Sequence, residues 1–163
     1  MNRRTLLASL GTVGMAGVAG CHDGIVSGEP MTTLRRFGVI NSDETSGHTY
    51  VLRIERDEMI VHESTHEVEA AEDGILPRRI VDCDWEAVPG TYTVSARVDG
   101  ESWQTFDVLD RYDTVPECVV AVVVHEGQSD ESGGLRLRVR DRCEEFAYDP
   151  RYCSADTSTP EGE

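Results

Sequence analysis

Residues 89–100, PGTYTVSARVDG, carry the clearest structural signal in the sequence. It begins with a proline-glycine turn, continues as a run in which polar and apolar residues alternate, and ends on Asp99-Gly100. Glycine accepts the positive φ that a tight hairpin turn requires, so Asp-Gly beside an alternating run is a strong hairpin signal. The residues that alternation places on one face are Tyr92, Val94, Ala96 and Val98. The segment therefore predicts a β-strand with one buried side and a turn at each end.

Similar short runs, rich in Val, Ile, Thr and Tyr, fill the chain on both sides of this segment. Turn residues separate them at the spacing that all-β sandwiches show. No window of about a dozen residues shows the 3.6-residue apolar period of a helix. The expected strands cover residues 34–41, 48–55, 59–70, 79–84, 91–98, 102–109, 118–125 and 135–143. We expect an all-β fold, namely a single antiparallel β-sandwich of about seven to eight strands.

A family resemblance rests on the same segment. Residues 89–100 resemble the penultimate hairpin of immunoglobulin-like and fibronectin type III-like modules on prokaryotic cell surfaces, where a proline-glycine turn leads into a strand with a buried tyrosine. The resemblance implies that Tyr92 is this tyrosine and that the domain is an immunoglobulin-like β-sandwich. Trp85, just before the turn, is expected to enter the core from the facing sheet.

The N-terminus resembles an export signal. Arg3 and Arg4 precede a weakly apolar run over residues 6–19, which is too short to span a bilayer as a helix, and the arginine pair resembles a twin-arginine (Tat) signal. Val18-Ala19-Gly20-Cys21 resembles a lipobox, at which a lipoprotein signal is cut and the new N-terminal cysteine is lipidated. We expect a cleaved Tat-type lipoprotein signal peptide and a lipid on Cys21; the alternative is an uncleaved anchor. Both place the protein at the extracytoplasmic face of the cell membrane.

The expected domain boundaries follow from these features. The signal peptide covers residues 1–20, and the Gly-, Ser- and Pro-containing residues 21–33 suit a flexible tether from the lipidated cysteine. The β-sandwich covers residues 34–145. Residues 146–163 form a C-terminal tail, which Cys153 is expected to tie to the domain.

The charge of the chain is strongly negative. Against 31 Asp and Glu there are 15 basic residues, all of them Arg, and the formal net charge is −16. An acidic chain with Arg in place of Lys resembles Tat-exported lipoproteins of haloarchaea. Such a surface repels itself in dilute buffer, whereas in molar salt the Debye length falls to about 3 Å and the repulsion is screened. The same charge argues against nucleic acid as a partner, because phosphate contacts need a basic stripe.

The cysteines agree with export. Beyond Cys21 the chain has an even number of them, which suits disulfides in an oxidising compartment. Counting outward from the centre of the loop between the last two expected strands places Cys118 opposite Cys143. A disulfide at the base of this hairpin leaves Cys83 for Cys153, and the other pairings of the four stay open.

Residues 62–66, HESTH, match the H-E-x-x-H signature of zinc peptidases. A peptidase needs this motif on a helix, where both imidazoles reach one zinc ion and the glutamate activates the bound water. The β-branched, alternating residues 59–70 predict a strand instead, on which positions four apart are separated by about 13 Å and do not share an ion. We expect His62 and His66 to be half-buried strand residues. The alternative is a zinc-dependent metallopeptidase with these ligands and Glu63 as base.

Two further metal hypotheses concern other residues. One places His48 near His66 across a hairpin, with Glu67 beside them, as a non-catalytic site. The other takes Asp82 and Asp84 as calcium ligands at the end of a strand. The favoured prediction includes no cofactor.

The sequence thus predicts a non-enzymatic, lipid-anchored cell-surface protein that acts as a binding, adhesion or accessory module. Its expected partners are the membrane, through Cys21, and an extracellular protein or cell-envelope component that meets its loops or a sheet edge. Nucleic acid is not expected.

Overall fold

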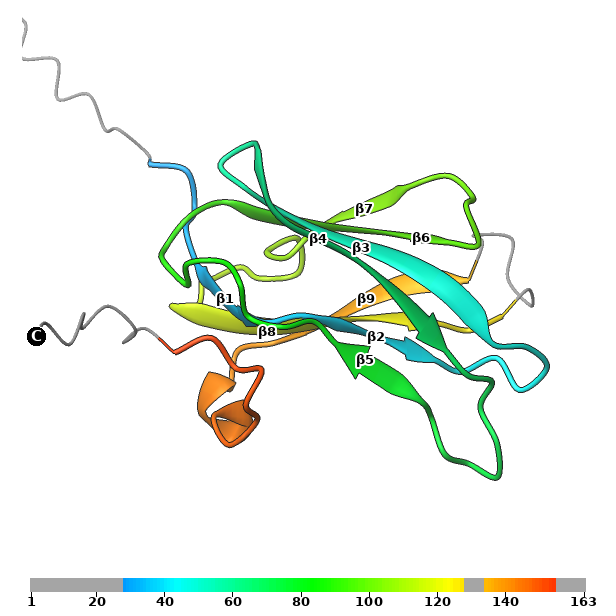
Figure 1. Cartoon of the computed structure of the whole chain (residues 1–163). Helices are drawn as coiled ribbons and strands as arrows, with labels where there is room; N and C mark the ends of the chain where they lie inside the picture. Colours follow the sequence, from blue (N-terminus) through cyan, green and yellow to red (C-terminus); the bar gives the residue numbers. More distant parts are fainter. Residues whose placement is uncertain (1–27, 128–133, 155–163) are drawn as a thin grey trace, which may run out of the picture.

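A computed structural model describes residues 28–127 and 134–154 of the chain. These residues contain nine strands, which form two sheets that face each other, and one short 3₁₀ helix (Figure 1). The strands are β1 (Thr33–Arg36), β2 (Gly38–Asn41), β3 (His48–Arg56), β4 (Met59–Val68), β5 (Arg78–Ile80), β6 (Tyr92–Val98), β7 (Gln104–Asp107), β8 (Cys118–His125) and β9 (Leu135–Arg140); the helix is η1 (Cys143–Phe146). The predicted all-β fold class is confirmed.

One sheet has four strands in the order β4-β3-β6-β7, and all of its pairings are antiparallel. The β6–β7 hairpin turns at Asp99 and Gly100, whose φ angles are 49° and 77°, so the turn predicted from the sequence is present. The β3–β4 hairpin turns at Asp57 and Glu58, with φ angles of 51° and 66°. The Asp57 carboxylate accepts a hydrogen bond from the Thr91 backbone N–H at 2.9 Å, which helps to hold this left-handed backbone in place.

The other sheet differs from the expected antiparallel arrangement. Strands β1 and β2 both lie along one side of β8 and run parallel to it, while β9 pairs with the other side in antiparallel fashion. The expected single strand over residues 34–41 is therefore two strands, interrupted at the fully buried Phe37. The parallel pairing arises because the chain leaves β2 for the facing sheet instead of folding back as a hairpin. Strand β5 completes the sheet beside β2.

Several expected strands are shorter in the structure. The strand expected over residues 79–84 is β5, which ends at Ile80. The Val81 N–H donates to the Phe37 carbonyl at 3.0 Å, and the Val81 side chain is fully buried. The strand expected over residues 135–143 is β9, which ends at Arg140, and Cys143 is the first residue of η1. Both strands lie at an edge of the sheet, where backbone pairing is available on one side alone.

The core lies between the two sheets. Its largest fully buried side chains include Tyr50, Tyr92, Phe37, Leu34, Leu52 and Ile54. The Tyr92 hydroxyl donates to the Val88 carbonyl at 2.8 Å, and the Trp85 indole N–H donates to the Leu34 carbonyl at 3.2 Å. Both aromatic side chains are thus buried with their polar atoms satisfied, as a stable core requires. The burial predicted for Tyr92 and Trp85 is confirmed, but Trp85 enters the core from the segment between β5 and β6 and not from a strand.

Two disulfides close the fold, and they are the two favoured in the sequence analysis. Cys118 is bonded to Cys143 and Cys83 to Cys153, with Cα–Cα distances of 6.3 and 5.5 Å. The Cys153 N–H also donates to the Arg35 carbonyl at 2.7 Å. The C-terminal segment is therefore docked beside β1, so that both ends of the described chain lie at the same end of the domain (Figure 1).

Candidate functional site

The H-E-x-x-H match lies on β4, an edge strand of the four-stranded sheet. In the antiparallel pairing with β3, His62 stands opposite Ile54 and His66 opposite Tyr50. The strand predicted for this motif is confirmed. An extended chain does not give the helical spacing on which zinc peptidases rely.

Ser64 joins the two histidines. Its hydroxyl oxygen lies 2.7 Å from His62 Nε2 and 2.8 Å from His66 Nε2. The Nδ1 atom of the buried His62 contacts the Asp84 carboxylate. The Ser64 hydroxyl donates to one of the two imidazole Nε2 atoms and accepts from the other. The four side chains form one continuous chain of hydrogen bonds along the inner side of β4.

The shared serine was not predicted from the sequence. The expectation for positions 62 and 66 on a strand was that the two imidazoles share a face but no ion, and in the structure they share the Ser64 hydroxyl. Asp84 is bonded to His62, and Asp82 lies 3.3 Å from Arg151, so each of these carboxylates already has a partner. In the part of the chain that the structure describes, no group of three or more His, Cys, Asp or Glu side chains is placed to hold a metal ion.

Glu63 lies on the other side of β4 from the two histidines. Its carboxylate accepts a hydrogen bond from Arg53 Nε at 2.7 Å, and the Arg53 guanidinium also lies 4.1 Å from the centre of the Trp103 ring. A peptidase base has to stand beside the metal ligands, where it activates the bound water. The position of Glu63 is that of an outward ion-pairing residue.

A polar groove of about 590 Å³ opens beside His66. The side chains that line it include His48, His66, Arg79 and Asp99. Burial lowers the pKa of His66, and the neighbouring His62 and Arg79 lower it further. His66 is therefore neutral at neutral pH, and the groove offers both hydrogen-bond donors and acceptors.

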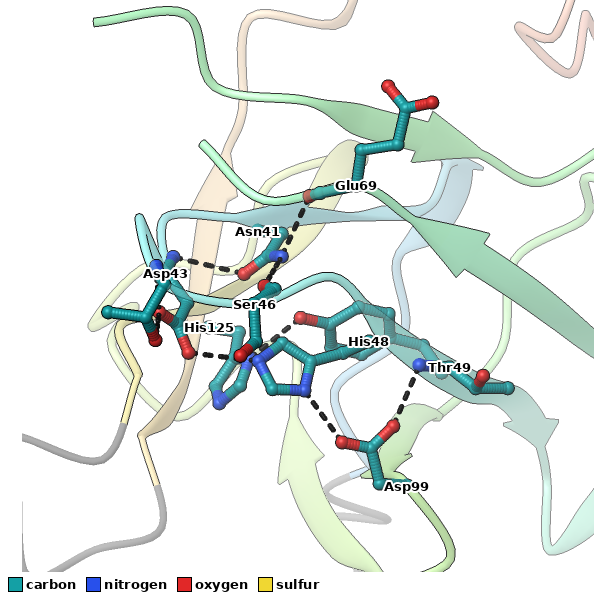
Figure 2. A network of polar contacts seen from close by, with 10 residues as sticks. Asn41, Asp43, Ser46, His48, Thr49, Glu69, Asp99 and His125 are labelled. Atoms are coloured by element: carbon teal, nitrogen blue, oxygen red, sulfur yellow. Dashed lines mark hydrogen bonds and ion pairs between the residues drawn. The ribbon is translucent and has the colours of Figure 1, made fainter. Parts of the chain in front are cut away.

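His48 is held between two aspartates at the end of this groove (Figure 2). Its Nε2 lies 2.9 Å from Asp43 and its Nδ1 lies 2.6 Å from Asp99. Burial lowers the pKa of His48, but the hydrogen bonds to the two carboxylates outweigh burial, and the net pKa is raised. Hydrogen bonds from Thr45 and His48 hold the pKa of Asp43 far below its usual range. The hypothesis that His48 joins His66 and Glu67 in a metal site is thus replaced by a histidine–diaspartate ion pair.

A second histidine lies directly behind this ion pair. The His125 ring centre is 4.6 Å from that of His48, and His125 Nδ1 lies 2.7 Å from the Tyr50 hydroxyl. Burial lowers the pKa of His125, and the charge of His48 lowers it further. The two adjacent imidazoles therefore prefer opposite charge states, one protonated between carboxylates and one neutral in the core.

Arginines gather on the outward side of the five-stranded sheet. On β9, Arg138 stands opposite Val122 and Arg140 opposite Val120. From the other side of β8, Arg36 of β1 also stands opposite Val120. An apolar strip on β8 thus runs between arginines on both flanks.

Two adjoining cavities of about 260 and 320 Å³ lie on this side of the sheet. The arginines that line one or both are Arg36, Arg78, Arg79, Arg138, Arg140 and Arg151. The apolar side chains between them include Ile40, Ile80, Val120, Val122 and Phe146. The one carboxylate among the residues that line these cavities, Asp149, lies 2.8 Å from Arg36. We call the surface formed by these residues the arginine face.

Three arginines of this face, Arg78, Arg138 and Arg140, are exposed. Within residues 28–127 and 134–154 none of the three forms an ion pair. The arginine face was not predictable from the sequence, because its members are far apart in the chain. Arg78 joins it through its pairing with Ile40 across the β2–β5 ladder. The alternating LRLRVR run over residues 135–140 was the local signal of its β9 side.

Comparisons with known proteins identified no relative of this chain. No family model, no curated protein and no solved structure matches the chain. Cys21, the expected lipidation site, lies outside the described residues. Among those that are described, no helix has the length and apolar character to span a bilayer.

Proposed function

We propose that this chain is a non-enzymatic binding module of immunoglobulin-like type, anchored by a lipid on Cys21 at the extracytoplasmic face of a cell membrane, and that its arginine face receives an anionic partner. The observation that carries the proposal is a contrast of charge. The chain has a formal net charge of −16, yet Arg78, Arg138 and Arg140 stand together beside apolar residues without a described ion pair.

This contrast favours binding over a purely structural role. In a chain with 31 acidic residues, an exposed arginine gains Coulomb energy wherever it stands among carboxylates. Arg78, Arg138 and Arg140 lack this gain, and they also lie close to other arginines. A partner that brings carboxylates or phosphates supplies the missing counter-charge, and the planar guanidinium is suited to bidentate contacts with either group.

The zinc-dependent metallopeptidase has no support from the geometry. His62 and His66 lie on a strand and share the Ser64 hydroxyl, while Glu63 pairs with Arg53 on the opposite side of that strand. We therefore retain the non-enzymatic binding module as the function and take the envelope partner to be a protein or another anionic component of the cell surface, not nucleic acid.

The anchoring part of the proposal depends on the lipobox-like sequence before Cys21. We expect Cys21→Ser to prevent lipidation and to release the protein into the medium. The test is fractionation of cells that express the wild type or the variant. Retention of the variant in the membrane fraction would contradict a lipid anchor.

The binding part of the proposal is tested by retention on anionic supports. The Cys21→Ser protein is passed in molar KCl over beads that carry either carboxylate or phosphate groups. We expect an Arg138→Ser, Arg140→Ser double variant to be retained less than its parent, and Arg111→Ser, which changes an exposed arginine outside the arginine face, to be retained equally. Equal retention of all three proteins would refute the assignment of binding to this face.

A further inference from the structure

We infer that the arginine face binds an extended acidic polypeptide segment, with its carboxylates on the arginines and its alternate apolar side chains on the floor between them. The inference rests on the proposed function, because it names the class of partner for the same face.

The spacing of the arginines matches an extended chain. Arg138 and Arg140 are two residues apart on one strand, so they lie about 7 Å apart on the same side. Alternate side chains of an extended peptide repeat at this same distance. A peptide that runs along β8 therefore meets successive arginines with every second side chain.

The width of the face admits one such chain. Arg140 and Arg36 stand on either side of Val120, on strands that flank β8. Two strand-to-strand spacings separate their backbones by about 10 Å, which leaves room for one extended backbone above the apolar strip. Carboxylates on one side of that backbone reach Arg138 and Arg140, while the alternate apolar side chains project to the other side, over Ile40 and Ile80.

The apolar residues between the arginines, here called the floor, provide the second set of contacts with the peptide. Ile40, Ile80 and Val122 are half-buried, and Phe146 closes one end with the Arg36 guanidinium 5.2 Å from its ring centre. The cavity over this floor is about 260 Å³, which accommodates a few aliphatic side chains. Their burial removes apolar surface from water, which favours binding.

A polypeptide fits this face better than a lipid surface or a nucleic acid. The exposed Arg138 and Arg140 stand above a half-buried Val122, so the apolar part is a recessed floor and not a protruding wedge that enters a bilayer. In molar salt the Debye length is about 3 Å, so long-range attraction to a charged membrane or phosphate backbone is screened. Direct arginine–carboxylate pairs and apolar contact act at short range and persist.

The test measures fluorescence anisotropy in molar KCl, with the full-length Cys21→Ser protein and a labelled peptide in which glutamate and valine alternate. A peptide with glutamine in place of glutamate is the matched control for charge. We expect the glutamate peptide to bind, and the double variant Arg138→Ser with Arg140→Ser to weaken that binding about a hundredfold, since each lost charged hydrogen bond is worth roughly a factor of ten. Arg111→Ser should leave the affinity unchanged.

A second double variant, Arg138→Lys with Arg140→Lys, keeps the charge and removes the bidentate geometry. It should lose less affinity than the serine variant, and equal melting temperatures of all variants show that the fold is intact. Equal binding of the glutamine peptide would overturn the inference. If anionic vesicles or single-stranded DNA bind through the same arginines and the glutamate peptide does not, the peptide inference fails while an anion-binding face stands. If none of these ligands binds, both fail.

Discussion

The hydroxyl oxygen of Ser64 lies 2.7 Å from Nε2 of His62, and through this contact the H-E-x-x-H match has a structural role. The two residues are on one face of an extended strand, so the side chains of the motif form a chain of hydrogen bonds and not the pair of zinc ligands of a peptidase. The Nδ1 contact with Asp84 completes the hydrogen bonds of the buried imidazole.

The first prediction concerns Ser64→Ala. The change removes the hydroxyl that serves both His62 and His66, so we expect the free energy of unfolding to fall by about 1–3 kcal/mol. Urea unfolding followed by tryptophan fluorescence measures it. Thr65→Ala, one exposed residue further along β4, is the control and should change stability by less than about 0.5 kcal/mol. Equal effects of the two substitutions would count against the hydrogen-bonded chain.

The second prediction compares the two disulfides. The Cys83–Cys153 bridge spans 70 residues and the Cys118–Cys143 bridge spans 25. Loop-closure entropy assigns them about 4.4 and about 3.5 kcal/mol, so replacing the first pair by serine should destabilise the fold more than replacing the second. Urea unfolding of the two double variants checks the order. The reverse order would show that chain entropy does not govern these bridges.

The third prediction is a pH dependence that originates at His48. Its folded pKa is raised above 6.5, because the hydrogen bonds to Asp99 and Asp43 outweigh burial. Its protonation therefore stabilises the fold fully below pH 6.5, and this contribution is lost as the pH rises through the higher folded pKa. The difference in unfolding free energy between wild type and His48→Gln should shrink over that window.

His125 provides the control of opposite sign. Its folded pKa is lowered from 6.5, first by burial and then by His48, so protonation at low pH favours the unfolded chain. In a His125→Gln variant the loss of stability as pH falls below 6.5 should therefore be smaller than in the wild type. Parallel pH profiles of the two glutamine variants would contradict the assigned charge states.

The fourth prediction concerns salt. With a net charge of −16, the folded chain repels itself in dilute buffer, and molar KCl screens that repulsion. We expect the melting temperature to rise from dilute buffer to molar KCl in differential scanning calorimetry. An unchanged melting temperature would argue against adaptation of this surface to high salt.

Local patterns in the sequence predicted those parts of the fold that depend on neighbouring residues. The alternation of Tyr92, Val94, Ala96 and Val98 and the turn at Asp99-Gly100 correctly gave β6 and its hairpin. The hairpin count that set Cys118 opposite Cys143 succeeded for the same reason, since β8 and β9 are consecutive and pair directly.

Long-range contacts were not predictable in this way. The parallel pairing of β1 and β2 with β8 joins residues 84 or 85 positions apart, and alternation carries no information about which strand lies beside which. The Asp84–His62 contact spans 22 residues of chain that includes irregular backbone. The arginine face was hidden for the same reason, since net charge says nothing of how like charges group in space.

Residue-resolved mapping by NMR in molar KCl locates the peptide on the protein surface. The backbone amide shifts of the Cys21→Ser protein are followed as the alternating glutamate–valine peptide is added. We expect the largest changes on β9, β8 and β5, around Arg138, Arg140 and Arg78, and we expect them to be lost in the Arg138→Ser, Arg140→Ser variant. Changes centred on β4 and the groove beside His66, with β9 unperturbed, would contradict this placement of the peptide.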